Sequence, residues 1–229
     1  MTARPPSPFR FAGGPRHRSS DVPAVSEDRD LVWFRHRDGL LVGLRPVHPE
    51  DKGVLLEGFG RLSEETRYQR FLAPMDRLTE RQVRYLTELD QVNHFAWAAG
   101  FLEPDGQETG VALARYVRTS TDPCVAEIAV VVADEYQGRG LGSLLLDGLA
   151  LVAMDHGIEE FTGFLLGDNH PMLRIFEHLG AVVHDDSPGV MRADLPLPPP
   201  GGLAVDDEGA AELVWVAGAA AHPSHWPCR

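Results

Sequence analysis

The sequence predicts a single α/β domain over residues 39–195. Strand-like alternation and helix-like hydrophobic spacing follow each other along this stretch, and a glycine-rich turn joins an apolar run to an amphipathic helix. The flanks are rich in Pro and Gly and show no hydrophobic period. We therefore expect a disordered arm over 1–38 and a flexible tail over 196–229.

The first half of this domain is expected to contain a strand, three short helices and a hairpin. Pro49 and the two acids after it favour a helix start, because proline fits the first turn and acids lie at the positive end of the helix dipole. Thr79 and Gln82 have the spacing of a capping box. The predicted elements are a strand at 40–47, helices starting at 49, 61 and 79, and strands at 94–102 and 110–118 with a turn at 104–106. The second of these helices is predicted to span 61–71.

The second half is built around a strand, a glycine-rich turn and a helix. The run at 125–133 is rich in β-branched residues and predicts a strand. After the turn, leucines recur at helical spacing until Gly157. The remaining predicted elements are a strand at 160–166, a helix at 171–179, and strands at 181–184 and 190–195.

Charge and composition exclude several classes of function. The 229 residues include 34 acids and 21 bases, a net charge of −13, without a basic run in the expected domain, so we expect no nucleic-acid partner. The apolar stretches are shorter than the roughly 18 residues of a membrane-spanning helix. Cys124 and Cys228 form no C-x-x-C pair and no signal-peptide core follows the N-terminal arginines, so we expect a cytoplasmic protein with no membrane partner.

The glycine-rich turn between strand and helix is typical of a phosphate site. Gly138, Gly140 and Gly142 leave main-chain N–H groups open at the positive end of a helix dipole, and Arg139 can add a charged donor. A tight turn that binds nothing is the alternative. A dinucleotide fold is disfavoured, because Asp155 lies within the predicted helix and cannot serve as the acid that ends a second strand.

Segment 137–142 reads Gln-Gly-Arg-Gly-Leu-Gly, which resembles the pyrophosphate motif Q/R-x-x-G-x-G/A of the GNAT acetyltransferases. Segments 67–75 and 93–96 resemble the GNAT domain of bacterial Pat-type protein lysine acetyltransferases. The resemblance covers about 40–195. It implies a GNAT fold, in which a mixed, mostly antiparallel central sheet is flanked by helices on both faces.

The resemblance also implies acetyl-CoA as the acyl donor, with its pyrophosphate on the glycine-rich turn and its pantetheine arm along 125–133. A main-chain N–H near Val131 or Val132 would hold the thioester oxygen. Asn169 is a further cofactor candidate, or alternatively only the cap of the next helix. The expected cofactor-binding residues are Val130, Val131, Val132, Gln137, Gly138, Arg139, Gly140, Leu141, Gly142 and Asn169.

Glu127 is the expected catalytic residue. It stands in an apolar run, where a carboxylate costs free energy unless it is partnered or useful, and a carboxylate there would help to deprotonate an attacking amine. A structural ion pair with Arg115 is the alternative. We assign no general acid, because Phe176 stands where many members of the family have a tyrosine.

Three residues of the early helices are candidates for substrate binding. Tyr68, Arg70 and Phe71 would border the acceptor site in the GNAT superfamily, although Phe71 also fits core packing and the other two also fit a solvated helix face. His94 fits a core histidine better than a base. His222, His225 and Cys228 have a spacing that could ligate zinc, but they lack a fourth ligand, so we expect no metal.

The resulting hypothesis is an acetyl-CoA-dependent N-acetyltransferase. It would transfer the acyl group to an amine, preferably a protein lysine, by direct attack in a ternary complex. An acyl-CoA synthetase is one protein target consistent with the resemblance. The alternatives are an enzyme that modifies a small amine and a CoA-sensing module without activity.

Overall fold

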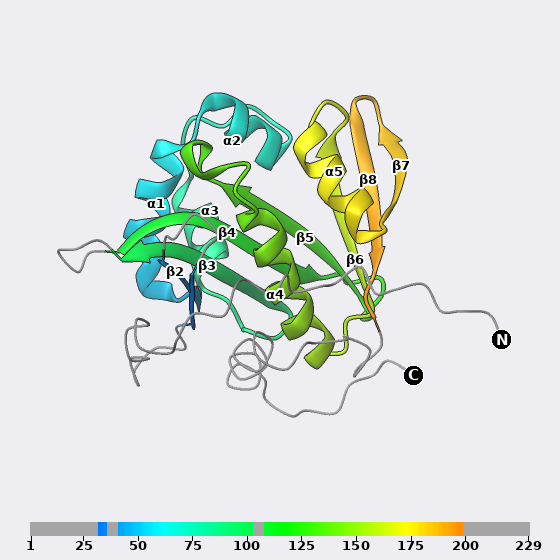
Figure 1. The fold of residues 1–229 in the computed structure, drawn as a ribbon, viewed down its shortest axis with the longest axis horizontal. Helices are drawn as coiled ribbons and strands as arrows, with labels where there is room; N and C mark the ends of the chain where they lie inside the picture. Colours follow the sequence, from blue (N-terminus) through cyan, green and yellow to red (C-terminus); the bar gives the residue numbers. More distant parts are fainter. Residues whose placement is uncertain (1–31, 36–40, 103–107, 199–229) are drawn as a thin grey trace.

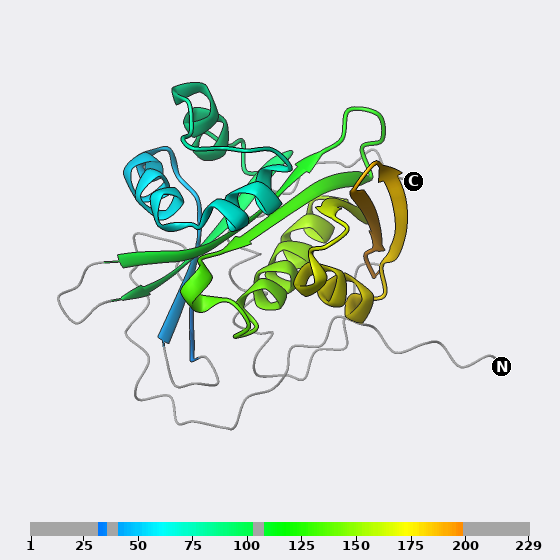
Figure 2. The same cartoon turned by 90° about the horizontal axis from the view of Figure 1, so that it is seen from above.

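A computed structural model describes residues 32–35, 41–102 and 108–198. Their strands form one eight-stranded sheet in the order β1-β2-β3-β4-β5-β6-β8-β7. Neighbouring strands are antiparallel except β5 and β6, which run parallel. Helices lie on both faces of this sheet (Figure 1, Figure 2), so the expected mixed, mostly antiparallel α/β fold is confirmed.

The first half of the domain supplies one edge of the sheet and three helices. Pro49 opens a short 3-10 turn, and Thr79 and Gln82 form the expected capping box, with the Thr79 amide donating to Gln82 Oε1 at 2.8 Å. The elements are β1 (Val32–Arg35), β2 (Leu41–Pro46), α1 (Lys52–Arg61), α2 (Glu64–Phe71), α3 (Glu80–Thr87), β3 (His94–Leu102) and β4 (Glu108–Arg118).

The second half follows the predicted order closely. A 3-10 turn at Asp134–Tyr136 leads from the apolar strand into the glycine-rich turn, and Asn169 caps the last helix. The elements are β5 (Val125–Val132), α4 (Leu141–Asp155), β6 (Glu160–Leu166), α5 (His170–Leu179), β7 (Val182–Ser187) and β8 (Val190–Pro196).

The predicted boundaries of the two flanks are wrong at their inner ends. Val32–Arg35 falls inside the arm expected to be disordered, yet it forms β1 and pairs with β2. At the other end, β8 reaches Pro196, and Leu197 is buried while its amide donates to the Glu159 carbonyl at 2.8 Å. Backbone pairing with the sheet extends the domain in both directions. Residues 1–31, 36–40, 103–107 and 199–229, which include the predicted turn at 104–106, lie outside the described residues.

The helix predicted over 61–71 corresponds to α2, which begins later than predicted, at Glu64. Helix α1 ends at Arg61, and α2 starts after Ser63, whose hydroxyl accepts a hydrogen bond from the Thr66 amide at 3.1 Å. A serine at this position satisfies an amide that the first turn leaves without a partner, so it starts a new helix. The short break lets α2 cross over the sheet, where it contacts β5 and β6.

The two faces of the sheet carry different layers. Helix α4 packs on β3, β4 and β5 over the main core, in which Trp97, Tyr116 and Phe161 are fully buried. Helices α1, α2 and α3 cover the other face (Figure 2), over a smaller core that includes Phe59 and Leu86. None of the helices in the described part of the chain has the length and apolar character needed to cross a membrane.

Candidate active site

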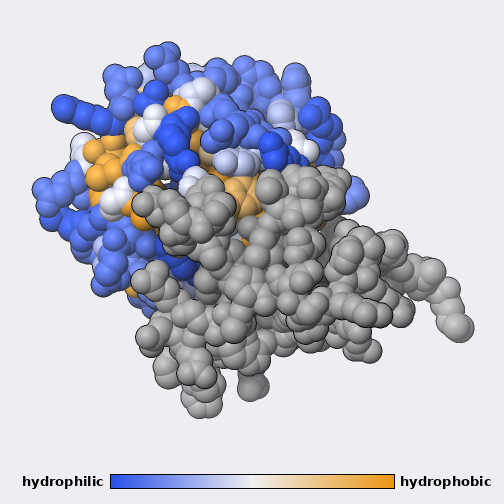
Figure 3. Space-filling view, turned by 60° about the vertical axis from the view of Figure 1, so that its left-hand side comes forward, coloured by the Kyte–Doolittle hydropathy of each residue, from blue (hydrophilic) through white to orange (hydrophobic). Residues whose placement is uncertain are grey.

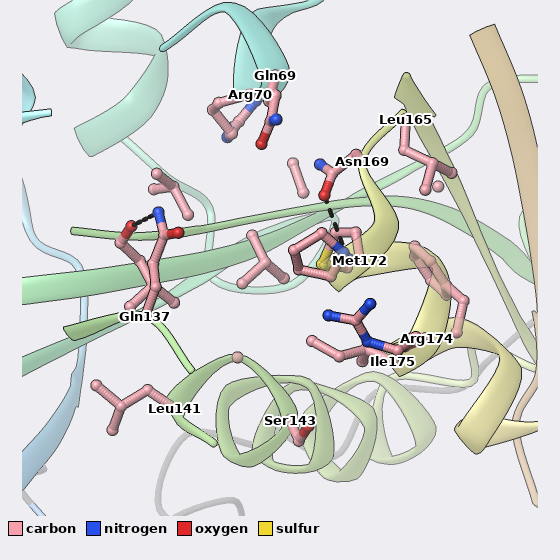
Figure 4. A pocket seen from close by; sticks show the side chains of 18 of the residues that line it. Gln69, Arg70, Gln137, Leu141, Ser143, Leu165, Asn169, Met172, Arg174 and Ile175 are labelled. Carbon is pink, nitrogen blue, oxygen red and sulfur yellow. Dashed lines mark hydrogen bonds between the residues drawn. The ribbon is translucent and has the colours of Figure 1, made fainter. Parts of the chain in front are cut away.

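Strands β5 and β6 separate halfway along their length. They pair only from Val125 to Ile128 on β5, so the stretch from Ala129 to Val132 has no partner residue on β6 among the described residues. A cavity of about 550 Å³ lies at this separation. It is lined by β5, the glycine-rich turn, the start of α4, β6, α5 and three polar residues of α2, Thr66, Gln69 and Arg70. Figure 4 shows the side chains of Gln69 and Arg70.

The glycine-rich turn uses backbone conformations that favour glycine. Gly138 has a φ of 71° and Gly140 a φ of 90°, both in the left-handed region, and Gly140 directly precedes α4. The first turn of α4 therefore leaves main-chain N–H groups and the positive end of its dipole beside the cavity. A Cβ atom on Gly142 would lie 3.5 Å from Ile175 Cδ1, so α4 and α5 approach closely here.

Polar contacts fix this turn to α2. Gln137 Nε2 donates to Thr66 Oγ1 at 3.2 Å and to the Val132 carbonyl at 3.1 Å. Asp134 accepts hydrogen bonds from the Ser63 amide and from the Ser63 and Thr66 hydroxyls, at 2.9, 2.6 and 2.7 Å. Burial alone would raise the pKa of Asp134, but these hydrogen bonds outweigh it and lower the pKa. The segment that follows β5 therefore positions α2 over the cavity.

The structure places two arginines differently from the sequence-based expectation. Arg139 donates through Nη2 to the Glu135 carbonyl at 3.1 Å and lies over the Tyr136 ring, 5.3 Å from its centroid, and it is not among the residues that line the cavity. Arg174 of α5, which the sequence analysis missed, lines the cavity and points into the space between α4 and α5 (Figure 4). No sequence motif marks Arg174, because its place depends on how α5 packs.

Asn169 fits both of its expected roles. Its Oδ1 accepts a hydrogen bond from the Met172 amide at 3.2 Å, which caps α5. The residue is also buried and lines the cavity (Figure 4). The expected cofactor residues that line this cavity are Val130, Val131, Val132, Gln137, Gly138, Gly140, Leu141, Gly142 and Asn169.

The Phe176 ring of α5 packs closely against Gly163 of β6, at the point where β5 and β6 separate. Phe176 is buried, and a Cβ atom on Gly163 would lie only 2.7 Å from Phe176 Cζ. A tyrosine hydroxyl would be attached to this same ring carbon. The glycine on β6 therefore makes room for the tip of the phenylalanine ring.

Glu127 lies on β5 just before the separation, beside Val117 of β4 and Thr162 of β6. Its side chain is exposed, so the argument that burial makes this carboxylate costly was wrong. Among the described residues it has no hydrogen bond and no ion pair within 4 Å. The alternative partner Arg115 instead contacts His94 Nε2 at 3.3 Å and lies 4.9 Å from the Tyr85 ring centroid.

Arg70 is the substrate-binding candidate that interacts electrostatically with Glu127. Desolvation by burial and the positive charge of Arg115 lower the pKa of Arg70 to about 9, while Glu127 opposes the shift, so this guanidinium stays charged at neutral pH. The Arg70 Cζ atom lies 4.9 Å from the centroid of the Phe71 ring, and Phe71 packs against the smaller core. Tyr68 is 40% exposed and lines neither described cavity.

His94 is half-buried and not a core residue. Burial and then the charge of Arg115 lower the pKa of His94 to about 4, so it is neutral at pH 7. Its ring packs on Tyr85 at a centroid distance of 4.9 Å. The described residues include no group of three or more His, Cys, Asp or Glu side chains that could hold a metal ion, and His222, His225 and Cys228 lie outside them.

Comparison with known proteins agrees with this geometry. The family model of the acetyltransferase (GNAT) domain matches residues 42–182. The chain is 38% identical over 165 residues to Acetyltransferase Pat of Mycolicibacterium smegmatis, covering 71% of this chain but only 48% of that protein. It is 31% identical over 170 residues to Acetyltransferase PA5475 of Pseudomonas aeruginosa, covering 74% of this chain and 89% of that one.

A solved structure shares the fold at similar sequence identity. The GNAT domain of S. lividans PAT superposes with a TM-score of 0.67 at 30% identity, covering 77% of this chain and all of that domain. The family match extends over more than half of the chain and includes the glycine-rich turn, the separated strands and Glu127. This protein therefore belongs to the GNAT family of acetyltransferases, and it is similar to the Pat-type members.

Proposed function

We propose that the protein transfers an acetyl group from acetyl-CoA to an amine, preferably the side chain of a protein lysine. The observation that carries this proposal is the 550 Å³ cavity, which joins the glycine-rich turn to the stretch of β5 that does not pair with β6. Glu127 lies on β5 two residues before this stretch and is not among the residues that line the cavity. A long thioester needs the turn and the open strand edge in one continuous space. Its anionic end, its amide-containing arm and its reactive carbonyl each require a different partner.

The acetyl-CoA pyrophosphate would bind at the start of α4. The main-chain N–H groups of this first turn and the helix dipole attract phosphate, and no atom lies within 4 Å of the position where Gly138 would carry a Cβ. Arg174 adds a positive charge on the facing side of the cavity. Arg139 would have to leave the Tyr136 ring to reach a phosphate, so we assign it a weaker contribution.

The pantetheine arm would lie along β5 between Ala129 and Val132. Main-chain groups on this edge have no pairing residues on β6 in the described chain, so they can pair with the amides of the arm. An N–H near Val131 or Val132 would then hold the thioester oxygen as negative charge develops on it. This placement puts the carbonyl carbon a few residues along the strand from Glu127.

Glu127 would act as the general base. A lysine amine has an ordinary pKa near 10.4, so at neutral pH it must lose a proton before it attacks. Glu127 would take this proton directly or through water. The amine nitrogen then bonds to the carbonyl carbon, the carbon–sulfur bond breaks, and CoA leaves as a thiolate, which is stable enough to need no dedicated acid. The nitrogen loses its second proton to the thiolate or to solvent, which leaves a neutral amide.

A protein lysine is the preferred acceptor because of the similarity to Pat-type acetyltransferases and because Glu127 is exposed to an incoming side chain. An acyl-CoA synthetase stays one candidate target, and the cytoplasmic location stays a prediction. A small amine as acceptor is the second enzymatic possibility, and CoA sensing without turnover is the non-enzymatic one.

Thiol release from acetyl-CoA, measured with a panel of purified proteins and small amines, tests this proposal. We expect release with at least one protein acceptor and a mass increase of one acetyl group on lysine. Release only with small amines would replace the protein acceptor by a metabolite. Calorimetric binding of acetyl-CoA without release would favour the sensor, and the absence of binding would overturn the proposal as a whole.

A further inference from the structure

Two arginines, Arg70 of α2 and Arg115 of β4, share one site with Glu127. Arg115 and Glu127 lie on the same face of the sheet, because Glu127 pairs with Val117 and Arg115 stands two residues before Val117. Residues in this diagonal relation have Cβ atoms roughly 7 Å apart. Arg115 and Glu127 both act electrostatically on Arg70, so the three charged groups lie close together.

Aromatic rings hold the two guanidinium groups. Arg115 Cζ lies 4.9 Å from the centroid of the Tyr85 ring, and Arg70 Cζ lies 4.9 Å from that of the Phe71 ring. A ring contacts the face of a guanidinium and leaves the N–H groups at its edge available. Arg115 Nη1 contacts His94 Nε2 at 3.3 Å. Among the described residues Arg70 has no hydrogen bond, and neither arginine has an ion pair within 4 Å.

This site has more positive than negative charge. Arg70 and Arg115 are opposed by Glu127, while His94 is neutral at pH 7. Asp90 lies near His94, but its oxygens already accept hydrogen bonds from residues 92–94 at 2.7 to 3.0 Å, and it is not among the groups that act on Arg70. One positive charge is therefore left for a ligand to neutralise.

The arginines lie where an acceptor has to approach. Arg70 lines the proposed acetyl-CoA cavity (Figure 4) and also a second cavity of about 100 Å³ between the sheet and helices α1, α2 and α3. Val131, at the position proposed for the thioester carbonyl, lines both cavities as well. An amine that reaches this carbonyl beside Glu127 therefore brings its neighbouring groups to the two guanidinium groups.

We propose that the acceptor lysine has an acidic residue close to it in the acceptor sequence, and that Arg70 and Arg115 bind the carboxylate of this residue. This rests on the proposed function. A guanidinium edge matches the two oxygens of a carboxylate, and both arginines are half-buried, where the attraction between charges is stronger than in bulk water. The whole chain has a net charge of −13, so the attraction to an acid comes from these two side chains and acts at short range.

The test is kcat/KM for lysine peptides of one common sequence. Each of the four positions within two residues of the lysine holds Asp in one peptide and Asn in its matched control. For at least one position we expect the Asp peptide to have about a tenfold higher kcat/KM, with a smaller difference at high salt. In Arg70→Gln and in Arg115→Gln this ratio should fall to about two or less. Arg84→Gln is the control, because Arg84 is exposed, pairs with Glu80 at 2.9 Å and lines neither cavity.

Two further variants keep the test informative. Arg70→Glu should reverse the preference, so that Arg at the same peptide position is used better than Asp, and a misfolded variant cannot produce this reversal. Leu56→Ser tests another surface, because hydrophobic residues occur on the surface on the side of α1 (Figure 3) and Leu56 of α1 is 46% exposed. We expect Leu56→Ser to leave the ratio unchanged. Thermal unfolding shows whether each variant is folded.

Four results would overturn the proposal while leaving acetyl transfer itself intact. The first is equal use of Asp and Asn peptides by the wild type. The second is a ratio that Arg84→Gln or Leu56→Ser lowers as much as Arg70→Gln does. The third is a protein that is acetylated while none of the peptides is, since selection would then lie away from these arginines. The fourth is use of Nα-acetyl-lysine in preference to its amide without any preference among the peptides, which would assign the carboxylate to a small acidic acceptor. Failure to release thiol with any acceptor overturns the proposed function instead.

Discussion

The two sides of strand β5 are built in different ways. On the side proposed to bind the cofactor, the features are main-chain groups: the glycine-rich turn, the start of α4 and the edge of β5 that does not pair with β6. On the side proposed to bind the acceptor, they are side chains from separate elements: Arg70 of α2, Tyr85 of α3, Arg115 of β4 and Glu127 of β5.

This difference separates the chemistry that the family shares from the choice of substrate. Main-chain N–H groups bind a pyrophosphate whatever side chains surround them, so the cofactor side tolerates sequence change as long as its backbone conformation is kept. The acceptor side instead depends on the identity of each of its side chains. The expected effects of mutations therefore differ in kind between the two sides.

The largest effect is expected on the acceptor side, from Glu127→Gln. The amide cannot accept the amine proton, so we expect kcat to fall about 100-fold or more at pH 7, with a smaller loss at pH 10, where more of the amine is already neutral. The KM for acetyl-CoA should stay within about twofold. Glu159→Gln, at an exposed glutamate that lines neither cavity, is the control. An unchanged pH–rate profile would remove Glu127 from the mechanism.

At the boundary between the two sides, Gly163→Ala should destabilise the fold. The new methyl group would lie 2.7 Å from Phe176 Cζ, and overpacking of this kind costs about 1–3 kcal/mol. Urea unfolding measures the loss. The double variant Gly163→Ala/Phe176→Leu replaces the ring by a smaller side chain and should recover part of the lost stability. If the two substitutions add independently, the contact between Gly163 and Phe176 does not position this junction.

Behind the cofactor side, Asp147 of α4 should make the stability depend on pH. Burial raises the pKa of Asp147 to about 7, and its Oδ1 is buried with no hydrogen-bond partner in the described chain. The folded state then keeps a proton that the unfolded chain has already lost, so stability falls as the pH rises from about 4 to about 7. Asp147→Asn removes this dependence and should gain about 1–2 kcal/mol over wild type between pH 5 and pH 8. The measurement is the melting temperature as a function of pH. If the melting temperatures of Asp147→Asn and wild type changed with pH in parallel, as we expect for the exposed control Asp185→Asn, this prediction would be contradicted.

The same difference between the two sides explains what the sequence could predict. The turn at 137–142 carries its whole signal within six residues and lies between a clear strand and a clear helix, so its place could be read locally. Helix caps such as Thr79 and Gln82 are local as well. Glu127 was predicted from its segment, and its catalytic role stays a prediction, because the reason given, burial, does not hold.

Other features could not be predicted because they depend on contacts between distant segments. Arg174 lines the cavity because α5 packs beside α4, and Arg115 turns to His94 because β3 and β4 pair in one register. Strand β1 was missed because only four residues pair with β2, too few for a visible period. Periodicity describes one segment at a time, whereas these contacts are set by topology.

The smallest expected effect isolates the cofactor side. Gly140 has a φ of 90°, which costs a residue with a Cβ atom about 1 kcal/mol, so Gly140→Ala should raise the KM for acetyl-CoA roughly fivefold and leave the pH profile of kcat unchanged. Gly53→Ala is the control, because Gly53 lies in α1 and a Cβ atom on it would meet nothing within 4 Å. If Gly140→Ala instead altered the pH profile, the turn and the base would be coupled, and the two sides of β5 would have to be treated as one unit.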